Sequence, residues 1–321
     1  MNKRERVFSL LAGKKPDHTP VGFWLHFPPA AQHGDESVRM HMQFMRETDT
    51  DILKIMNENL LHAQGVTIFS TADLGKFRGF SRQDAIYRDQ MQIIRALADQ
   101  AKGDYPILAT VHGLIASAFH ETGFAGKYTS CGYCLPIFCR ERPEQMKRVF
   151  QTIACSLMEL VDCSLEAGAD GIFYAALGGE RHYFTDAEYE EFVLPYEKQV
   201  YDYIKERTPF NVLHICKSNI DLSRYVSLKP AIVNWGIYPN QVSLTQGAEL
   251  FPDSIVLGGF PDRQGVLVDG EKQDIAAHTR AILQEMNGRP FIVGSDCTLP
   301  TDISTSRIRW VVETVRQADE Q

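Results

Sequence analysis

A histidine and a cysteine lie two positions apart at the end of a short apolar stretch, residues 211–216. If this stretch is a β-strand, side chains at positions i and i+2 point to the same side, so His214 and Cys216 converge. Imidazole nitrogen and thiolate sulfur are both good zinc ligands, and Cys297 near the C-terminus offers a third. Alone, a His-x-Cys pair is a weak signal, because most single cysteines on apolar strands are packing residues.

Two cysteines and one histidine leave the fourth tetrahedral position of a zinc ion open. This arrangement is typical of catalytic zinc sites, whereas structural sites are closed by four protein ligands. An open zinc ion lowers the pKa of the molecule that binds to it, so it can convert a substrate thiol into a thiolate nucleophile. We therefore interpret His214, Cys216 and Cys297 as metal ligands at a catalytic site.

Alternating strand and helix patterns must position these residues. Short apolar runs are typical of parallel strands covered by helices, and we predict eight strands, at residues 21–25, 51–56, 106–111, 170–175, 211–215, 231–235, 254–257 and 291–294. Helical patterns separate them, and residues 2–13 predict an N-terminal helical extension. Eight repeats without a Pro/Gly/Ser-rich linker predict a single (β/α)8 TIM barrel over residues 1–321. An open doubly wound sheet is the alternative.

In such barrels the active site lies at the carboxyl ends of the strands. The three predicted ligands fall at these positions, because strands five and eight can both present residues to the same mouth. Other polar side chains also occur there. We predict that the substrate-binding residues are His26, Asn57, His112, Tyr174 and Asp262.

A second group of thiols leaves several interpretations open. Cys131 and Cys134 form a Cys-x-x-Cys motif, which can be a metal knuckle or a redox pair. We find neither a second such motif nor a thioredoxin-type βαβ start nearby. Ordinary reduced thiols are therefore the favoured interpretation.

Composition excludes several classes of partner. The net charge of −8 and the pI of about 5.7 are unlike those of a protein that binds a phosphate backbone. No apolar run approaches the roughly 20 residues of a membrane helix, and the basic N-terminus lacks the apolar region of a secretory signal. Seven cysteines, an odd number, fit a reducing compartment. We expect a cytoplasmic protein that binds neither nucleic acid nor membranes.

Five segments carry a resemblance to a known family. They are residues 4–7 (Arg-Glu-Arg-Val), 16–21 (Pro-Asp-His-Thr-Pro-Val), 166–171 (Glu-Ala-Gly-Ala-Asp-Gly), 192–196 (Phe-Val-Leu-Pro-Tyr) and 299–302 (Leu-Pro-Thr-Asp). Together they resemble the uroporphyrinogen decarboxylase superfamily, through nearly the whole chain. The resemblance implies a TIM barrel, with a homodimer as one expectation. It also implies one of two chemistries, decarboxylation without a cofactor or zinc-dependent methyl transfer with a corrinoid.

Decarboxylation of uroporphyrinogen, a step of porphyrin biosynthesis, is the less favoured alternative. The resemblance implies an Arg-rich loop after the first strand that binds the substrate's propionates, but residues 24–31 contain no arginine. A polyanionic tetrapyrrole needs cationic partners, and bidentate arginine is the natural one. The decarboxylases also carry an aspartate after the second strand, where this chain has Lys54 and Asn57. Their late histidine segment is replaced here by residues 295–297 (Ser-Asp-Cys).

The methyltransferase branch binds zinc through a His-x-Cys…Cys pattern, which His214, Cys216 and Cys297 match residue by residue. The resemblance implies that the metal activates a thiol, which takes a methyl group from methylcobalamin on a corrinoid partner protein. Related members run in the other direction, from a small-molecule methyl donor to the corrinoid. The fourth zinc position is either vacant or filled by a side chain, for which the candidates are Tyr174, His112 and Asp296. A third interpretation is a non-catalytic module that binds a metal or a corrinoid protein.

Overall fold

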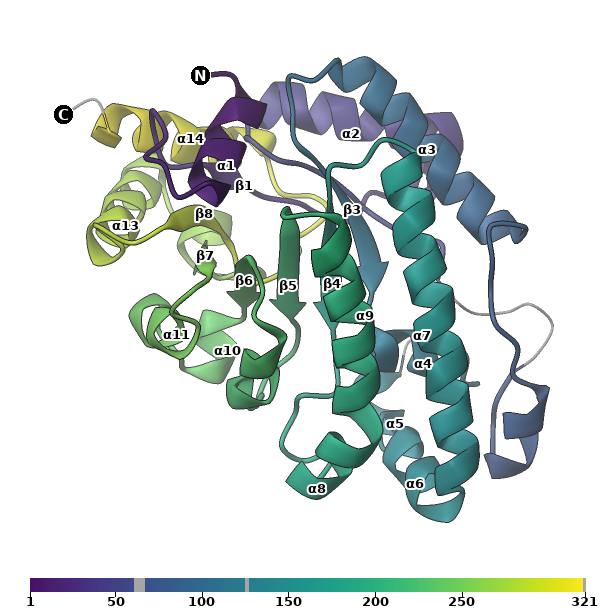
Figure 1. Ribbon diagram of the computed structural model, residues 1–321. Helices are drawn as coiled ribbons and strands as arrows, with labels where there is room; N and C mark the ends of the chain where they lie inside the picture. Colours follow the sequence, from purple (N-terminus) through teal and green to yellow (C-terminus); the bar gives the residue numbers. More distant parts are fainter. Residues whose placement is uncertain (61–66, 125–126, 320–321) are drawn as a thin grey trace.

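Eight parallel strands surround a common interior in the computed structural model, which describes residues 1–60, 67–124 and 127–319 (Figure 1). The strands are β1 (Val21–Gly22), β2 (Leu53–Ile55), β3 (Ile107–His112), β4 (Gly171–Ala176), β5 (Asn211–Ile215), β6 (Ile232–Trp235), β7 (Ile255–Phe260) and β8 (Phe291–Ser295). Their order in the sheet is β1-β8-β7-β6-β5-β4-β3-β2. The predicted TIM-barrel fold is confirmed, and so is the N-terminal helix.

The helices ring these strands and connect each to the next (Figure 1). The α-helices are α1 (Lys3–Leu11), α2 (Gly34–Thr48), α3 (Ala85–Ala101), α4 (Leu114–His120), α5 (Tyr128–Cys131), α6 (Cys134–Glu141), α7 (Pro143–Glu166), α8 (Asp186–Glu188), α9 (Leu194–Arg207), α10 (Ile237–Asn240), α11 (Leu244–Leu250), α12 (Val266–Asp269), α13 (Lys272–Glu285) and α14 (Thr305–Asp319). The 3-10 helices are η1 (Pro29–Ala31), η2 (Thr71–Lys76) and η4 (Leu222–Leu228), and η3 (Tyr189–Val193) is a π-helix. None of the helices within the described ranges is long and apolar enough to cross a lipid bilayer.

Asp51 bridges the seam between β1 and β2, the two strands at the ends of the sheet order. Its backbone N–H donates to the carbonyl oxygen of Val21 at 2.7 Å, and its Oδ2 accepts from the N–H of Val21 at 2.8 Å. Its Oδ1 accepts from Nη1 of Arg6 at 2.5 Å. Because Arg6 belongs to α1, this carboxylate ties the N-terminal helix to the seam of the barrel.

Helix α1 covers the amino-terminal end of the barrel interior. Its side chains Val7 and Leu10 belong to the apolar cluster that fills the interior. Other members of this cluster are Trp24, Ile52, Met56, Leu108, Phe173, Phe210, Val212, Ile232, Ile255, Leu257 and Ile292. The strand arrows point away from α1 and toward α5, α6 and α8 (Figure 1). The carboxyl ends of the strands therefore form the open mouth.

Side chains along each strand alternate between the barrel interior and the surrounding helices. On β5, Val212 packs in the interior, whereas Leu213 and Ile215 belong to the larger core between strands and helices. On β4, Phe173 packs in the interior and Tyr174 in the larger core. This alternation decides which polar residues near the mouth can meet.

Candidate metal centre

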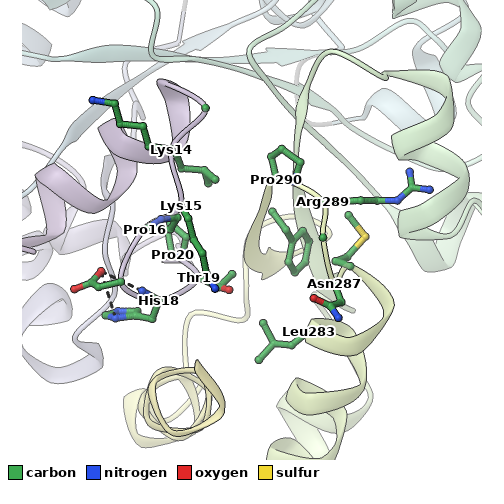
Figure 2. Close-up of a pocket in the computed structure, with 16 residues that line it drawn as sticks. Lys14, Lys15, Pro16, His18, Thr19, Pro20, Leu283, Asn287, Arg289 and Pro290 are labelled. Carbon is green, nitrogen blue, oxygen red and sulfur yellow. Dashed lines mark hydrogen bonds and ion pairs between the residues drawn. The ribbon is translucent and has the colours of Figure 1, made fainter. Parts of the chain in front are cut away.

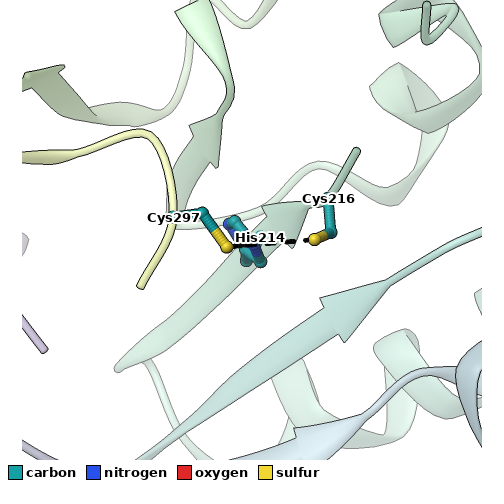
Figure 3. A group of neighbouring side chains, drawn as sticks. All are labelled: His214, Cys216 and Cys297. Carbon is teal, nitrogen blue, oxygen red and sulfur yellow. Dashed lines mark hydrogen bonds between the residues drawn. The ribbon is translucent and has the colours of Figure 1, made fainter. Parts of the chain in front are cut away.

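His214 and Cys216, at the end of β5, point toward Cys297, which follows β8 (Figure 3). Sγ of Cys297 lies 3.9 Å from Sγ of Cys216 and 3.5 Å from Nε2 of His214. Zn–S bonds of about 2.3 Å and Zn–N bonds of about 2.05 Å at tetrahedral angles separate two sulfurs by about 3.8 Å and sulfur from nitrogen by about 3.6 Å. The ligand atoms of the three residues all lie within 4.8 Å of one another. The donor set suits zinc, and the two distances from Cys297 match those of a tetrahedral zinc ion.

Asn234 on β6 selects the nitrogen that His214 presents to the thiols. Its Nδ2 donates to the carbonyl oxygens of Leu257, at 2.8 Å, and Ser295, at 3.1 Å. Its Oδ1 therefore faces Nδ1 of His214, at 2.5 Å, and accepts a hydrogen bond from it. Nε2 keeps its lone pair and points at Cys297, as a metal-binding imidazole requires.

The sequence pattern did not predict Asn234. A signal for it does exist, because Asn234 is the polar residue of an otherwise apolar strand, residues 232–235. It also pairs in register with His214 on the neighbouring strand. That register becomes known only with the structure.

The two thiols share one proton unequally. The hydrogen bond that Cys216 donates holds the pKa of Cys297 well below its usual range. The same hydrogen bond, together with burial, raises the pKa of Cys216 well above its usual range. Cys297 is therefore the thiol that ionises more readily, and Cys216 holds its proton until a metal displaces it.

The three residues line a pocket of about 150 Å³ at the mouth of the barrel. Its other lining residues are Trp24, His26, Lys54, Met56, Asn57, Thr110, His112, Ala116, His120, Phe173, Ala175, Leu177, Lys217 and Thr298. No arginine is among the described residues that line it. A volume of this size accommodates a small molecule and is far below that of a tetrapyrrole.

Three of the predicted substrate-binding residues line this pocket: His26, Asn57 and His112. Nδ1 of His26 lies 2.5 Å from Oε1 of Glu58. Nε2 of His112 lies 2.9 Å from the carbonyl oxygen of Asn57, and burial lowers the pKa of this imidazole. The Asn57 amide donates to the carbonyl oxygen of Thr110 at 3.1 Å. These contacts hold the side chains in place in the wall of the pocket.

Tyr174 lies outside the pocket, contrary to the expectation that it binds substrate or completes the metal site. Its side chain is 0% exposed and faces the helices. Its hydroxyl donates to Glu197 and accepts from the N–H of Leu114 at 3.0 Å. The physical reason is strand alternation, since Phe173 and Ala175 occupy the pocket-facing positions of β4.

Two carboxylates lie close to Cys297 without lining the described pocket. Oδ2 of Asp296 accepts from the N–H of Tyr238 at 3.1 Å, and burial raises the pKa of Asp296 to about 7. Asp262 pairs with Arg263 at 3.2 Å, and burial together with the charge of Cys297 raises its pKa. Asp262, predicted to bind substrate, thus lies beside the site rather than in its wall.

The Cys-x-x-Cys motif forms no disulfide. Cys131 ends α5 and Cys134 begins α6, and both are free thiols. Burial raises the pKa of Cys134 to about 11, so this thiol is protonated and unreactive at neutral pH. This environment agrees with ordinary reduced thiols.

A larger pocket, of about 480 Å³, lies at the opposite end of the barrel (Figure 2). The loop that carries Lys14, Lys15 and His18 forms one wall, and the loop that carries Asn287 and Arg289 forms the other. Residues at this face of a TIM barrel serve stability rather than chemistry. Among the described residues, the group of side chains suited to a metal lies at the other end. The smaller pocket is therefore the candidate active site.

A sequence profile of the uroporphyrinogen decarboxylase (URO-D) family matches residues 64–318. The chain belongs to this family. It is also similar in sequence to the methylcobamide:CoM methyltransferase MtbA of Methanosarcina acetivorans, with 22% identity over 275 residues that cover 83% of this chain and 72% of that protein. The MtbA of Methanosarcina mazei is 21% identical over 274 residues, with the same shares covered, 83% and 72%.

Solved structures share the fold. A methyltransferase from Methanosarcina mazei superimposes over 100% of both chains with a TM-score of 0.80 and 13% sequence identity. A B12-independent methionine synthase from Shewanella sp. W3-18-1 covers 94% of this chain and 96% of that chain, with a TM-score of 0.55 and 13% identity. At such identities the likeness concerns the fold alone.

Proposed function

We propose that this protein is a zinc-dependent methyltransferase that moves a methyl group between a corrinoid on a partner protein and a small molecule. The observation that carries the proposal is the convergence of His214, Cys216 and Cys297, in which the two distances from Sγ of Cys297 match edges of a zinc tetrahedron. The similarity to MtbA, whose name states transfer between a methylcobamide and CoM, supports this class of reaction.

The residues of the pocket have defined tasks in this reaction. His214, oriented by Asn234, offers Nε2, and the two cysteines offer thiolates. A bound zinc ion would supply Lewis acidity that lowers the pKa of a substrate thiol. The pocket of about 150 Å³ admits the small molecule but not a corrin ring. The partner protein must therefore present its corrinoid at the mouth.

The decarboxylase alternative receives no support from this pocket. Uroporphyrinogen carries many carboxylates, and the described lining contains no arginine to pair with them. The volume is also too small for a tetrapyrrole. Turnover of uroporphyrinogen is expected to be absent.

Metal content and methyl transfer test the proposal together. Purified wild-type protein is expected to hold about one zinc ion per chain, and Cys216→Ser and Cys297→Ser are expected to lose it. Cys155→Ser is the matched control, because Cys155 is an exposed free cysteine. Demethylation of methylcobalamin by added thiol, followed by its visible spectrum, is expected only in proteins that keep the metal. Metal-free wild-type protein with an intact fold would exclude the proposal, and bound metal without transfer would favour a non-catalytic binding module.

A further inference from the structure

Lys54 places an ammonium group inside the barrel without an ionic partner. Its side chain extends from β2 into the interior and is 5% exposed. Its Nζ lies 2.9 Å from Sδ of Met56, and 4.5 and 5.5 Å from the ring centroids of Phe173 and Trp24. Across the described ranges, no carboxylate forms a salt bridge with it.

Such a charge is expensive to keep. Burying an ammonium group without a counter-ion is strongly unfavourable, and two aromatic faces offset only part of that cost. Burial lowers the pKa of Lys54 to about 7, although the charges of Cys297 and Glu58 act in the opposite direction. An anion bound nearby would raise this pKa again and keep the amine charged.

The position of Lys54 shows where that anion would lie. Lys54 lines the same pocket as His214, Cys216 and Cys297. The Phe173 ring below its ammonium stacks on the His214 imidazole, with centroids 5.3 Å apart and planes at 25°. The same aromatic ring thus contacts both the ammonium and one of the candidate metal ligands.

Charge counting shows which anion needs compensation. A divalent cation, two thiolates and a neutral imidazole sum to zero. A substrate thiol that loses its proton in this pocket then adds one uncompensated negative charge. In a buried pocket such a charge is costly unless a cation lies nearby.

Three other basic groups of the pocket are exposed to solvent, paired with a carboxylate or neutral. Lys217 is exposed and lies 5.5 Å from the centroid of the Tyr128 ring. His26 is paired with Glu58, and the low pKa of buried His112 keeps it neutral. Of the lysines in the described lining, Lys54 is the buried one.

We propose that Lys54 is a positioning residue whose ammonium charge compensates the substrate thiolate in this pocket, whatever charge the rest of the substrate carries. This inference rests on the proposed function. The S–H bond of the substrate breaks, the electron pair stays on sulfur, and the proton leaves to solvent. No electron transfer is involved.

Lys54→Met and Lys54→Gln remove the charge, and Lys54→Arg keeps it. Each is prepared with Co(II) in place of zinc, because a thiolate bound to Co(II) gives a charge-transfer absorption band. The band is titrated against pH with 2-mercaptoethanol, cysteamine and 2-mercaptoethanesulfonate, which carry a neutral, a cationic and an anionic tail. Both neutral variants are expected to raise the pH midpoint by about one unit with all three thiols. This shift corresponds to an about tenfold loss of bound thiolate at neutral pH. Lys54→Arg is expected to stay near wild type.

Two results overturn the inference while leaving the proposed function intact. An unchanged midpoint in both neutral variants would make Lys54 a packing residue. A raised pH midpoint seen only with 2-mercaptoethanesulfonate would show that Lys54 binds the anionic tail of the substrate rather than compensating its thiolate. Zinc content and thiol binding of the wild-type protein report separately on the proposed function. If the wild-type protein bound neither zinc nor thiol, both the proposed function and the inference on Lys54 would fail. Circular dichroism melting verifies folding, and Lys54→Met is expected to melt no lower than wild type because it relieves a buried charge.

Discussion

The amide oxygen of Asn234 lies 2.5 Å from Nδ1 of His214, and this contact decides that Nε2 is the nitrogen facing Cys297. The amide cannot turn over, because its nitrogen donates to two backbone carbonyls, those of Leu257 on β7 and Ser295 on β8. Three strands thus cooperate to orient one imidazole ring. A metal that binds here meets a ligand whose orientation is already determined.

Asn234→Ala is expected to weaken zinc binding by about 10- to 100-fold, because the imidazole loses the partner that orients it. Affinity is measured by competition with a chromophoric chelator. Asn287→Ala, at the exposed far end of the barrel, is the control and is expected to keep wild-type affinity. Equal affinities in the two variants would show that Asn234 does not support the metal.

Zinc binding at pH 7 is expected to release fewer than the two protons that two ordinary thiols would release. The lowered pKa of Cys297 favours its thiolate in the metal-free protein, whereas the raised pKa of Cys216 keeps that thiol protonated. Below the pKa of Cys297 a second proton must also leave, so affinity falls more steeply as the pH drops. Calorimetry in buffers of different ionisation enthalpy counts the protons, and a value near two at pH 7 would contradict this assignment.

Glu197→Gln is expected to stabilise the protein at pH 8 and to leave it little changed near pH 4. Burial raises the pKa of Glu197 to about 7, against the hydrogen bond that Tyr174 donates. The folded state therefore binds a proton that the unfolded state loses above pH 4.5, so stability falls as the pH rises from about 4.5 to about 7. The gain is a few kcal/mol at most, at about 1.4 kcal/mol per pKa unit. Urea unfolding of both proteins across this range measures it, and parallel stability profiles would refute the explanation.

Asp51→Ala is expected to cost about 3–5 kcal/mol of unfolding free energy, because it leaves the buried Arg6 guanidinium without this partner and the Val21 N–H without an acceptor. Asp202→Ala removes one partner of the exposed Lys198 pair and is expected to cost about 1 kcal/mol or less. Chemical denaturation compares the two. Similar losses would mean that the seam of the barrel does not depend on Asp51.

The barrel could be predicted because its cause is visible in the sequence. Each strand is a short apolar run followed by a helical pattern, and parallel strands covered on both faces require that pattern. The convergence of His214 and Cys216 follows from strand alternation alone. The barrel then explains how Cys297, far along the chain, reaches the same mouth.

Other parts of the site depend on strand register and on contacts between distant segments, which could not be predicted from the sequence. Tyr174 lies near the end of a strand, but whether it faces the pocket depends on the alternation of β4. The role of Asn234 depends on its register against β5. The isolation of Lys54 depends on which side chains from other strands surround it.

Helix α1 closes the amino-terminal end of the barrel with Val7 and Leu10, so the pocket opens at the carboxyl ends of the strands. Under the proposed function, both reactants must use this single opening. The small thiol has to enter before the corrinoid protein docks over it, and methylated product cannot depart until that partner withdraws. Under the proposed function, helix α1 therefore imposes an order in which the thiol binds before the corrinoid protein and the methylated product leaves after it. The helix does so although it lies at the far end from the reacting atoms.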